Sequence, residues 1–468
     1  MPVVLWTDAL IFLLLGVVIA FAFHAHSQEH LRAPWREVAK HPMGMVAATI
    51  LLAYLGIALI DSLHFHPRNQ GPVSSAEGYG PEVISVFDWL ATPLREHTEK
   101  TYAAPFATEL YAKETIELPD GTRQRIYPRL RYGGAHLQDP KTEHFRNIAS
   151  IALAASALAL ELWLVVCAGI CAVSAFRHGQ SIAHTARVIL AGGSDLPWRA
   201  ILITLGVLIW LTSLGVGLGT KYHVFGTDKV GQDVFYQALK GVRTGLLLGT
   251  LTTLIMLPFA VLFGITAGYF RGWMDDVVQY LYTTLNSIPG VLLVAAAVLI
   301  LQAYMANHAE QFNSVAERAD LRLLFLCVIL GIKSWTGLCR LLRAETLKLR
   351  ELEYVQAAQA FGVGHVSILL RHLLPNVMHI ISITVVLDFS GLVLAEAVLS
   401  YIGIGVDPSM DSWGNMINSA RLELAREPMV WWSVAAAFTF MFTLVLAANL
   451  FSDAVRDAFD PRLRSTVV

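Results

Sequence analysis

The feature that most limits how this chain can fold is a series of about nine long apolar segments, each near the length that crosses a bilayer as a helix. The chain has 468 residues, of which 55% are hydrophobic and 15% charged. A water-soluble domain would have to bury an implausible amount of apolar surface at that composition. The sequence therefore predicts an all-α polytopic membrane protein. The expected spans are residues 4–23, 43–63, 147–176, 201–220, 245–270, 280–304, 321–335, 379–402 and 430–451.

Positive charges in the short loops predict the orientation of these spans. Lys and Arg cluster in 24–42, 177–199 and 340–371 and at the C-terminal end, and nine alternating helices place all four regions on one side. That side is expected to be the cytosol, with the N-terminus outside and the C-terminus inside. The first segment could also be a signal peptide, but it has Asp8 where a basic residue is expected, so we interpret it as a helix.

A polar interruption at residues 354–376, YVQAAQAFGVGHVSILLRHLLPN, has the most defined local pattern. An apolar, small-residued face at helical spacing is predicted for Tyr354, Ala357, Ala358 and Phe361. Gly362 and Gly364 suit a helix end, and a second helical run from Val366 is expected to stop at Pro375. The pattern predicts two short helices joined by a tight turn.

This order of residues resembles the EAA loop of ABC-importer permeases. The loop reads Gln356-Ala357-Ala358, then Gly362, then Leu374-Pro375; Gln356 replaces the acidic first residue of the motif. In that family the loop forms the coupling helix that docks on the ATPase subunit. The resemblance implies a coupling role for Glu353, Tyr354, Gln356, Ala357, Ala358, Phe361, Gly362, Val363 and Gly364. The alternative is an ordinary cytosolic hairpin between spans.

A second polar segment, residues 223–249, leads into the fifth apolar segment. Gly226 and Gly231 permit tight turns, and Asp228 and Asp233 can cap a following helix. The segment is similar to the His-x-Phe-Gly-Thr-Asp-x-x-Gly-Arg-Asp segment of C-type permeases of dipeptide and oligopeptide ABC importers. The matching positions are His223, Phe225, Gly226, Thr227, Asp228, Gly231, Asp233, Gly241 and Arg243, with Gln232 in place of the Arg. A purely structural outer loop is the alternative.

Further resemblances at 268–275, 287–289, 396–405 and 412–414 extend the match over about 199–461. They imply a type I ABC-importer permease core of six helices at 199–468, with the coupling loop at 338–378. The rest would comprise two N-terminal helices (1–63), an extracytoplasmic domain (64–146), and a third extra helix with a cytosolic linker (147–198).

The polar region 64–146 predicts a small domain outside the membrane. Pro81 with Val83, Val86, Phe87 and Leu90 indicates an amphipathic helix that begins near the proline. Residues 115–127 indicate a hairpin around Pro119-Asp120-Gly121. The domain would either contact a binding protein or pack over the helices.

Acidic residues inside the apolar segments are expected to face protein or water, since an unpaired central charge costs on the order of 2.5–3.5 kcal/mol by insertion scales. Asp388 and Glu396 lie two helical turns apart in the eighth segment. They either line a translocation path, together with Ser400, or pair with Lys333 or a partner subunit. Glu161 in the third segment is expected to pack against a neighbour.

Several function classes receive no support. The net charge of −2 gives no electrostatic basis for nucleic-acid binding. The chain has neither a Walker A sequence nor a nucleophile elbow. The cysteines are interpreted as buried thiols, and the histidine groups as residues at membrane boundaries instead of metal sites. These residues are Cys167, Cys171, Cys327 and Cys339, and His24, His26, His30, His64 and His66.

The sequence thus predicts a non-enzymatic permease subunit of a peptide-type ABC importer in the bacterial inner membrane. The resemblance implies a second permease subunit, two ATP-binding subunits that carry ATP and Mg, and an extracytoplasmic substrate-binding protein. This chain itself would bind no cofactor. The main alternative is a secondary transporter that uses Asp388, Glu396 and Glu161 as proton or cation sites. A membrane enzyme acting at the outer domain is a third hypothesis.

Overall fold

The computed structural model of the chain describes residues 2–27, 29–67, 83–117, 123–308, 310 and 314–459. The chain divides into two compact units, each built from segments that are distant in the sequence. Within the described residues, unit 1 contains 2–3, 39–243 and 411–447, and unit 2 contains 4–38, 244–410 and 448–459. Two long helices, α9 (Val234–Phe270) and α17 (Trp432–Phe459), run through both units.

Eight helices in the described part of the chain are long and apolar enough to cross a membrane. The prediction of an all-α polytopic membrane protein is therefore confirmed. The first predicted span is the helix α1 (Trp6–Ser27), whose described apolar part, Trp6–Ala20, is shorter than these eight. The eight are α3 (Pro42–Asp61), α6 (Pro140–His178), α8 (Trp198–Gly219), α9, α11 (Gly290–Asn307), α12 (Val315–Leu349), the run that ends in α15 (Leu374–Tyr401), and α17.

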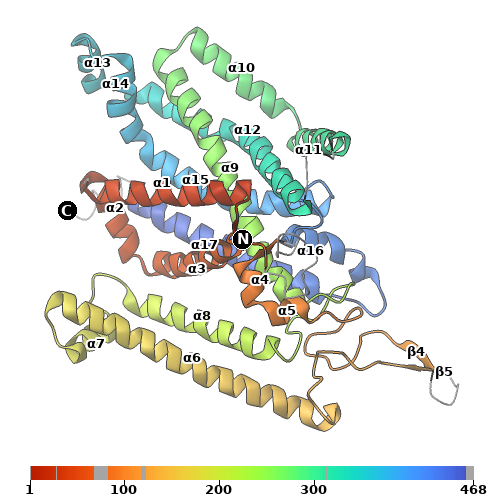
Figure 1. Ribbon diagram of the computed structural model, residues 1–468. Helices are drawn as coiled ribbons and strands as arrows, with labels where there is room; N and C mark the ends of the chain where they lie inside the picture. The colour runs from red at the N-terminus through yellow and green to blue at the C-terminus, as the bar shows by residue number, and fades with distance from the viewer. Residues whose placement is uncertain are drawn as a thin grey trace. The chain divides into compact units, whose positions relative to one another are not determined.

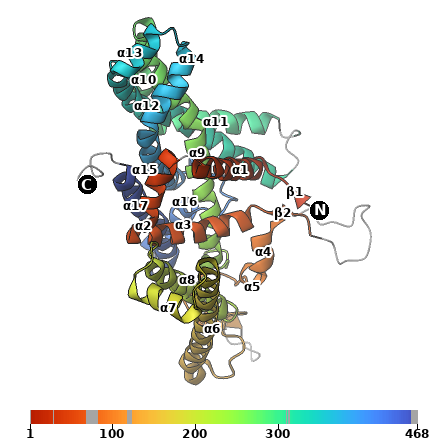
Figure 2. The same cartoon turned by 90° about the vertical axis from the view of Figure 1, so that its left-hand side faces the viewer.

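In unit 1, α6 and α8 run side by side along most of their length (Figure 1, Figure 2). The indole N–H of Trp163 donates to the carbonyl of Leu202 at 2.8 Å, and Gly206 leaves the space that this ring fills. Small residues let helices approach closely in lipid, where packing replaces the hydrophobic effect. A short helix, α7 (Ile182–Ala191), connects the two.

The region 64–146 contains short elements at one end of unit 1. The predicted hairpin is confirmed, because β4 (Glu114–Glu117) pairs antiparallel with β5 (Arg123–Ile126); its turn lies outside the described residues. A helix at Pro81 was predicted, but α4 (Val86–Leu90) begins only after Ser85, which caps it. The cause is local: Ile84–Ser85 is strand β3, in an antiparallel sheet with β1 (Pro2–Val3) and β2 (His64–Phe65). Pro81 itself is outside the described residues.

Further short helices of unit 1 are α5 (Thr92–Glu96), α16 (Trp413–Ala420) and η3 (Glu423–Ala425).

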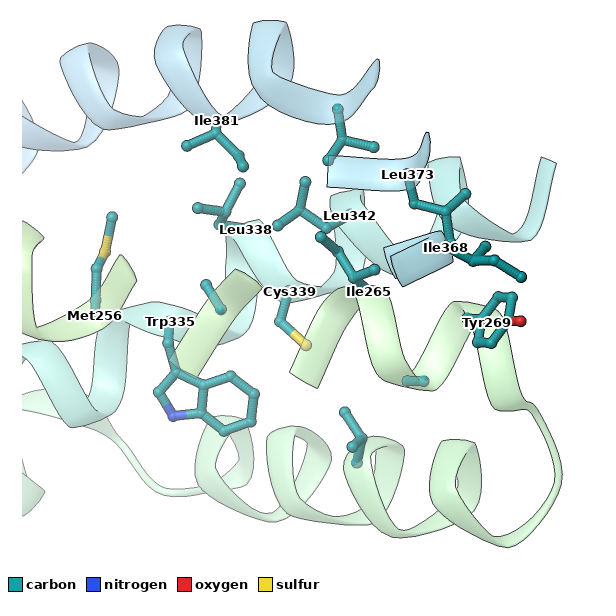
Figure 3. Close-up of a cluster of buried hydrophobic side chains, with 14 of the residues drawn as sticks. Met256, Ile265, Tyr269, Trp335, Leu338, Cys339, Leu342, Ile368, Leu373 and Ile381 are labelled. Atoms are coloured by element: carbon teal, nitrogen blue, oxygen red, sulfur yellow. The ribbon is translucent and has the colours of Figure 1, made fainter. Parts of the chain in front are cut away.

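Unit 2 holds the remaining helices around two groups of buried apolar side chains. One group, here called the loop-anchoring cluster, joins side chains of α9, α12 and α15 to the loop between α12 and α15 (Figure 3). Ile265 and Leu342 lie at its centre, with Ile368 and Leu373 packed over them. The other elements of this unit are α2 (Glu29–Lys40), α10 (Trp273–Ser287), α13 (Glu353–Ala360), α14 (His365–Ile368) and the π-helical turn η2 (Leu369–Leu373).

The expected span 280–304 is wrong at its start. The chain forms α10, which ends at Ser287, and a separate α11, which begins at Gly290. Pro289 explains the break, because it has no N–H to donate and its ring disfavours a helical residue before it. Ile288 accordingly has extended backbone angles. The membrane-crossing helix therefore starts ten residues later than predicted.

The prediction that the helical run from Val366 stops at Pro375 is also wrong. The helix continues from His365 through the π-helical turn η2 into α15 without interruption. Pro375 occupies the first turn of α15, where a backbone N–H is dispensable, and the wider π turn directly precedes it. The polar interruption between the two spans thus ends near Gly364.

Gly264 offers a test of the contact between α9 and α12. A Cβ atom there would lie 2.8 Å from Cβ of Leu342 and 2.9 Å from the carbonyl of Cys339. We expect Gly264→Val to destabilise the protein in detergent by about 1–3 kcal/mol, because the added methyl groups force the two helices apart. Gly337→Val is the control, since nothing lies within 4 Å of a Cβ at that position. Equal midpoints of thermal unfolding for the two variants would contradict this packing.

Candidate functional site

The loop between α12 and α15 presents a small apolar surface on α13. Phe361 follows α13 directly and is 87% exposed, while Tyr354 and Ala357 on the same face are also exposed. Glu353 and Gln356 lie exposed beside them. Aromatic side chains such as Phe361 and Tyr354 are enriched at protein–protein interfaces relative to the rest of the surface.

The other face of α13 is packed against the protein. Val355 and Ala358 are buried members of the loop-anchoring cluster, and Val363 packs against it. The sequence pattern had placed Ala358 on the exposed face, but the structure turns it inward. Gly362 has φ of +76°, which closes the turn after α13, and Gly364 precedes α14.

Tyr269, near the end of α9, connects this loop to the helices behind it. Its hydroxyl lies 2.8 Å from Nδ1 of His365 and accepts a hydrogen bond from the Gln359 side chain at 3.3 Å. Its carbonyl accepts from Arg350, which follows α12, at 2.6 Å. On the opposite side of α13, the Asn376 side chain in α15 donates to the hydroxyl of Tyr354 at 3.1 Å. The loop that contains α13 is therefore held by hydrogen bonds to α9 and α15.

A second candidate site lies in unit 1, around the segment that precedes α9. His223 is buried, with Nδ1 2.7 Å from Oδ2 of Asp233 and Nε2 3.5 Å from Oε1 of Glu99. Glu99 also accepts backbone N–H bonds from residues 131–133 at 2.8–3.1 Å. The other carboxylate oxygen of Asp233 caps the start of α9, as predicted, by accepting from the N–H groups of residues 235 and 236. Asp228 instead accepts from residues 230 and 232 in its own turn.

The pKa values of this group follow from its hydrogen bonds. Burial alone would lower the pKa of His223, but the contacts with Asp233 and Glu99 outweigh it and raise the pKa to about 9. Burial would likewise raise the pKa of Glu99, yet His223 and the three backbone N–H groups lower it to about 2. The folded state thus holds a charged histidine between two carboxylates.

Thr227 and two glycines bring the 64–146 region against the same segment. The hydroxyl of Thr227 donates to the carbonyl of Thr101 at 2.8 Å and accepts from the N–H of Ala103 at 2.7 Å. Gly226 and Gly231 have φ of +67° and +80°, and a side chain at either would overlap the backbone of the 64–146 region. Trp432 of α17 donates to the carbonyl of Thr227 at 2.9 Å. The 64–146 region therefore packs directly on this segment before α9.

A charged cluster lies one to two turns further along α9. Nζ of Lys240 is 2.7 Å from Oδ1 of Asp88 and 3.1 Å from Oδ1 of Asp61. Arg243 donates to the hydroxyl of Ser62 at 3.2 Å. Burial raises the pKa of nearby Asp411 to about 7; Lys240 opposes that shift, whereas the neighbouring carboxylates add to it. The helices α3 and α4, which lie outside the resemblance, are thereby joined to α9.

The three predicted path residues all lie in α15, but their environments differ. Glu396 and Ser400 are buried, and the hydroxyl of Ser400 donates to Oε1 of Glu396 at 2.7 Å. Asp388 is half-buried and has no ion-pair partner among the described residues. Lys333, the partner considered for it, instead extends over Gly290 of α11.

Sequence reasoning missed Glu99, Tyr269, His365 and Asn376. Tyr269 lies in the segment 268–275, which resembles the permease family. Nothing in that segment indicates that the Tyr269 hydroxyl contacts the loop between α12 and α15. Glu99 is separated from His223 by more than a hundred residues, and no local pattern signals their contact. No group of three metal-ligating side chains occurs among the residues with described positions. The side chains of His24, His26 and His30 lie outside them.

Comparison with known proteins gives consistent results. A family model described as binding-protein-dependent transport system inner membrane component matches residues 260–465. A glutathione transport system permease protein of Pectobacterium atrosepticum is 33% identical over 243 residues, 52% of this chain and 74% of the relative. An oligopeptide transport system permease protein of Haemophilus influenzae is 30% identical over 243 residues, 52% and 71% of the two chains. A putative peptide permease protein of Brucella suis is 33% identical over 241 residues, 51% and 73%.

The buried histidine predicts a pH dependence for the attachment of the 64–146 region. Because the folded-state pKa of His223 is raised from 6.5 to about 9, its stabilisation is full below pH 6.5 and lost as the pH rises through 9. The stabilisation from Glu99, whose pKa is lowered from 4.5, is lost only as the pH falls through about 2. We expect protease cleavage within 97–137 of the detergent-solubilised protein to increase between pH 7 and 9.5.

The matched variant is His223→Gln, which cannot carry the charge. Its cleavage is expected to be faster at pH 7 and nearly independent of pH over the same interval. An unchanged pH profile in this variant would show that another group controls the attachment. Activity of the protease on a denatured control peptide corrects for its own pH dependence.

Proposed function

The chain belongs to the family of binding-protein-dependent transport system inner membrane components, and we propose that it forms one half of the translocation path of an ATP-driven importer of di- or oligopeptides. Its membership makes it a multi-pass inner-membrane permease component of an ABC transport system. The peptide class rests on the relatives, which are permeases for glutathione, oligopeptides and peptides. The comparisons give no support to the secondary-transporter alternative.

The observation that carries the coupling role is the exposed face of α13. Phe361 projects into solvent, while the helix behind it is fixed to three long helices through the loop-anchoring cluster, Tyr269 and Asn376. We propose that Glu353, Tyr354, Gln356, Ala357 and Phe361 contact an ATP-binding subunit, with Gly362, Val363 and Gly364 shaping the turn. Ala358 acts in this proposal by holding α13 on the protein.

The proposed mechanism is a single coupled equilibrium. Two ATP-binding subunits, which carry ATP and Mg, close on nucleotide and move α13. The rigid attachment of α13 to α9, α12 and α15 then changes the side to which the path opens. Each state must be favoured by its own ligand for the coupling to exist, so nucleotide and the loaded binding protein act on the same equilibrium.

The path itself is proposed to pass along α15. Asp388, half-buried and without an ion-pair partner in the described chain, would face the aqueous path or the second permease subunit. Glu396 and Ser400, hydrogen-bonded to each other, would form the polar end of the same helix. The substrate-binding protein would dock outside, the N-terminus lying on that side and the C-terminus in the cytosol. The core would comprise 199–468, and the 64–146 region a small domain outside the membrane.

Truncation of the exposed aromatic tests the docking proposal. We expect Phe361→Ala to reduce co-purification of the ATP-binding subunits by about 30-fold, because loss of a central interface anchor costs on the order of 2 kcal/mol. Phe442→Ala, which truncates an exposed aromatic in α17, is the control and should leave the complex intact. Retention of the ATP-binding subunits by the Phe361 variant, at the control level, would refute this contact.

An energy-source experiment separates the proposal from a proton-coupled carrier. Cells that express the complete system should retain peptide uptake when a protonophore collapses the proton gradient and ATP is maintained by fermentation. Asp388→Asn should preserve that insensitivity, because in this proposal Asp388 faces the path or the second permease subunit and carries no coupling proton. Uptake that stops when the proton gradient collapses, although ATP is maintained, would instead support the proton-coupled carrier.

A further inference from the structure

The helix α6 carries a carboxylate at the centre of its apolar stretch. Glu161 lies fifteen residues after Arg146 and sixteen before Arg177, and no other charged residue lies between those two arginines. At about 1.5 Å per residue, it is some 22–24 Å from either charged end. The hydrocarbon core extends only about 15 Å to each side of its midplane, and a glutamate side chain cannot span that distance to reach water.

The packing of α6 on α8 shows which way Glu161 points. Ala159 and Trp163 both face α8: Ala159 is buried, and the Trp163 indole is hydrogen-bonded to α8. Residues two positions apart in a helix are turned by about 200°, so Glu161 lies on the far side of α6 from both. Its side chain is exposed and has no hydrogen bond or ion pair within the described chain.

Small side chains lie on the same line of α6 as this carboxylate. Positions four and seven residues from Glu161 lie within about 40° of it around the helix. Three of these positions and the position eleven residues on carry a strip of exposed alanines, Ala154, Ala157, Ala168 and Ala172, while the fourth, Val165, is an exposed larger residue. Such a strip lets the backbone of a second helix come close, which is the usual geometry of helix association in lipid. The strip and the carboxylate face the same direction.

The charge of Glu161 indicates which kind of helix binds to the alanine strip of α6. A second copy of α6 in the same contact would bring two Glu161 carboxylates together, and neither α6 between its flanking arginines nor α8 beyond Arg199 offers a basic residue. Intramembrane carboxylates are costly unless paired or hydrogen-bonded. We propose that this face of α6 binds a membrane-spanning helix of a different polypeptide that carries Lys or Arg at mid-depth. The proposal is independent of the transport cycle described above.

Photo-crosslinking in native membranes tests the contact directly. A p-benzoylphenylalanine probe at position 157, one turn before Glu161, should give an adduct with another membrane protein. Mass spectrometry of the adduct should locate the joined residue in an apolar helix that contains Lys or Arg. The same probe at position 173, exposed but turned by about 120° from Glu161, should not give that adduct.

Replacement of the carboxylate distinguishes the proposed pairing from simple proximity. Glu161→Leu makes α6 more apolar and preserves insertion, and it should lower the yield of the position-157 adduct at least about fivefold. Leu162→Ala, an exposed neighbour on a different face, should leave that yield unchanged. Adducts only with lipid or with a second copy of this chain, an adduct helix without Lys or Arg, or an unchanged yield in Glu161→Leu would each overturn the proposal.

Discussion

The close approach of α9 and α12 is the contact on which the rest of unit 2 depends. Gly264 and Gly268 remove the side chains that would hold the helices apart, so the backbone of α9 lies directly against residues 339–346 of α12. Cys339 and Leu342, which lie at this contact, are also members of the loop-anchoring cluster. The loop between α12 and α15 can be rigid, although it is short and largely polar, because it packs on helices that are already fixed to each other.

In unit 1, the 64–146 region is attached to the segment before α9 and to the first turns of α9. The attachment is made by polar contacts: the carboxylates of Glu99 and Asp88, with that of Asp61 just before the region, bind His223 or Lys240. A buried charge without a partner is costly, and removing one member of a buried, hydrogen-bonded pair is strongly destabilising. Loss of one partner would therefore leave an uncompensated buried charge. The attachment of the 64–146 region thus depends on every member of these pairs.

The sequence predicted the parts of the structure that depend on local order. Apolar length, the turn at Gly362, the hairpin at 114–126 and the cap at Asp233 are properties of a few neighbouring residues, and all occur. The misplaced helix ends at Pro289 and Pro375 show the limit of such reasoning, because the same residue type breaks one helix and is tolerated in the other. Contacts such as Glu99 with His223, or the burial of Ala358, depend on tertiary packing that no local pattern encodes.

The π-helical turn at Leu369–Leu373 has a consequence for the phase of the helix that follows. One extra residue in a turn advances every later side chain by about 100° around the axis. The face that α15 offers along its length, from Asp388 to Ser400, is thus determined by a bulge located several turns upstream. A single-residue deletion there would leave the composition of the span intact and yet rotate its whole polar face into different surroundings.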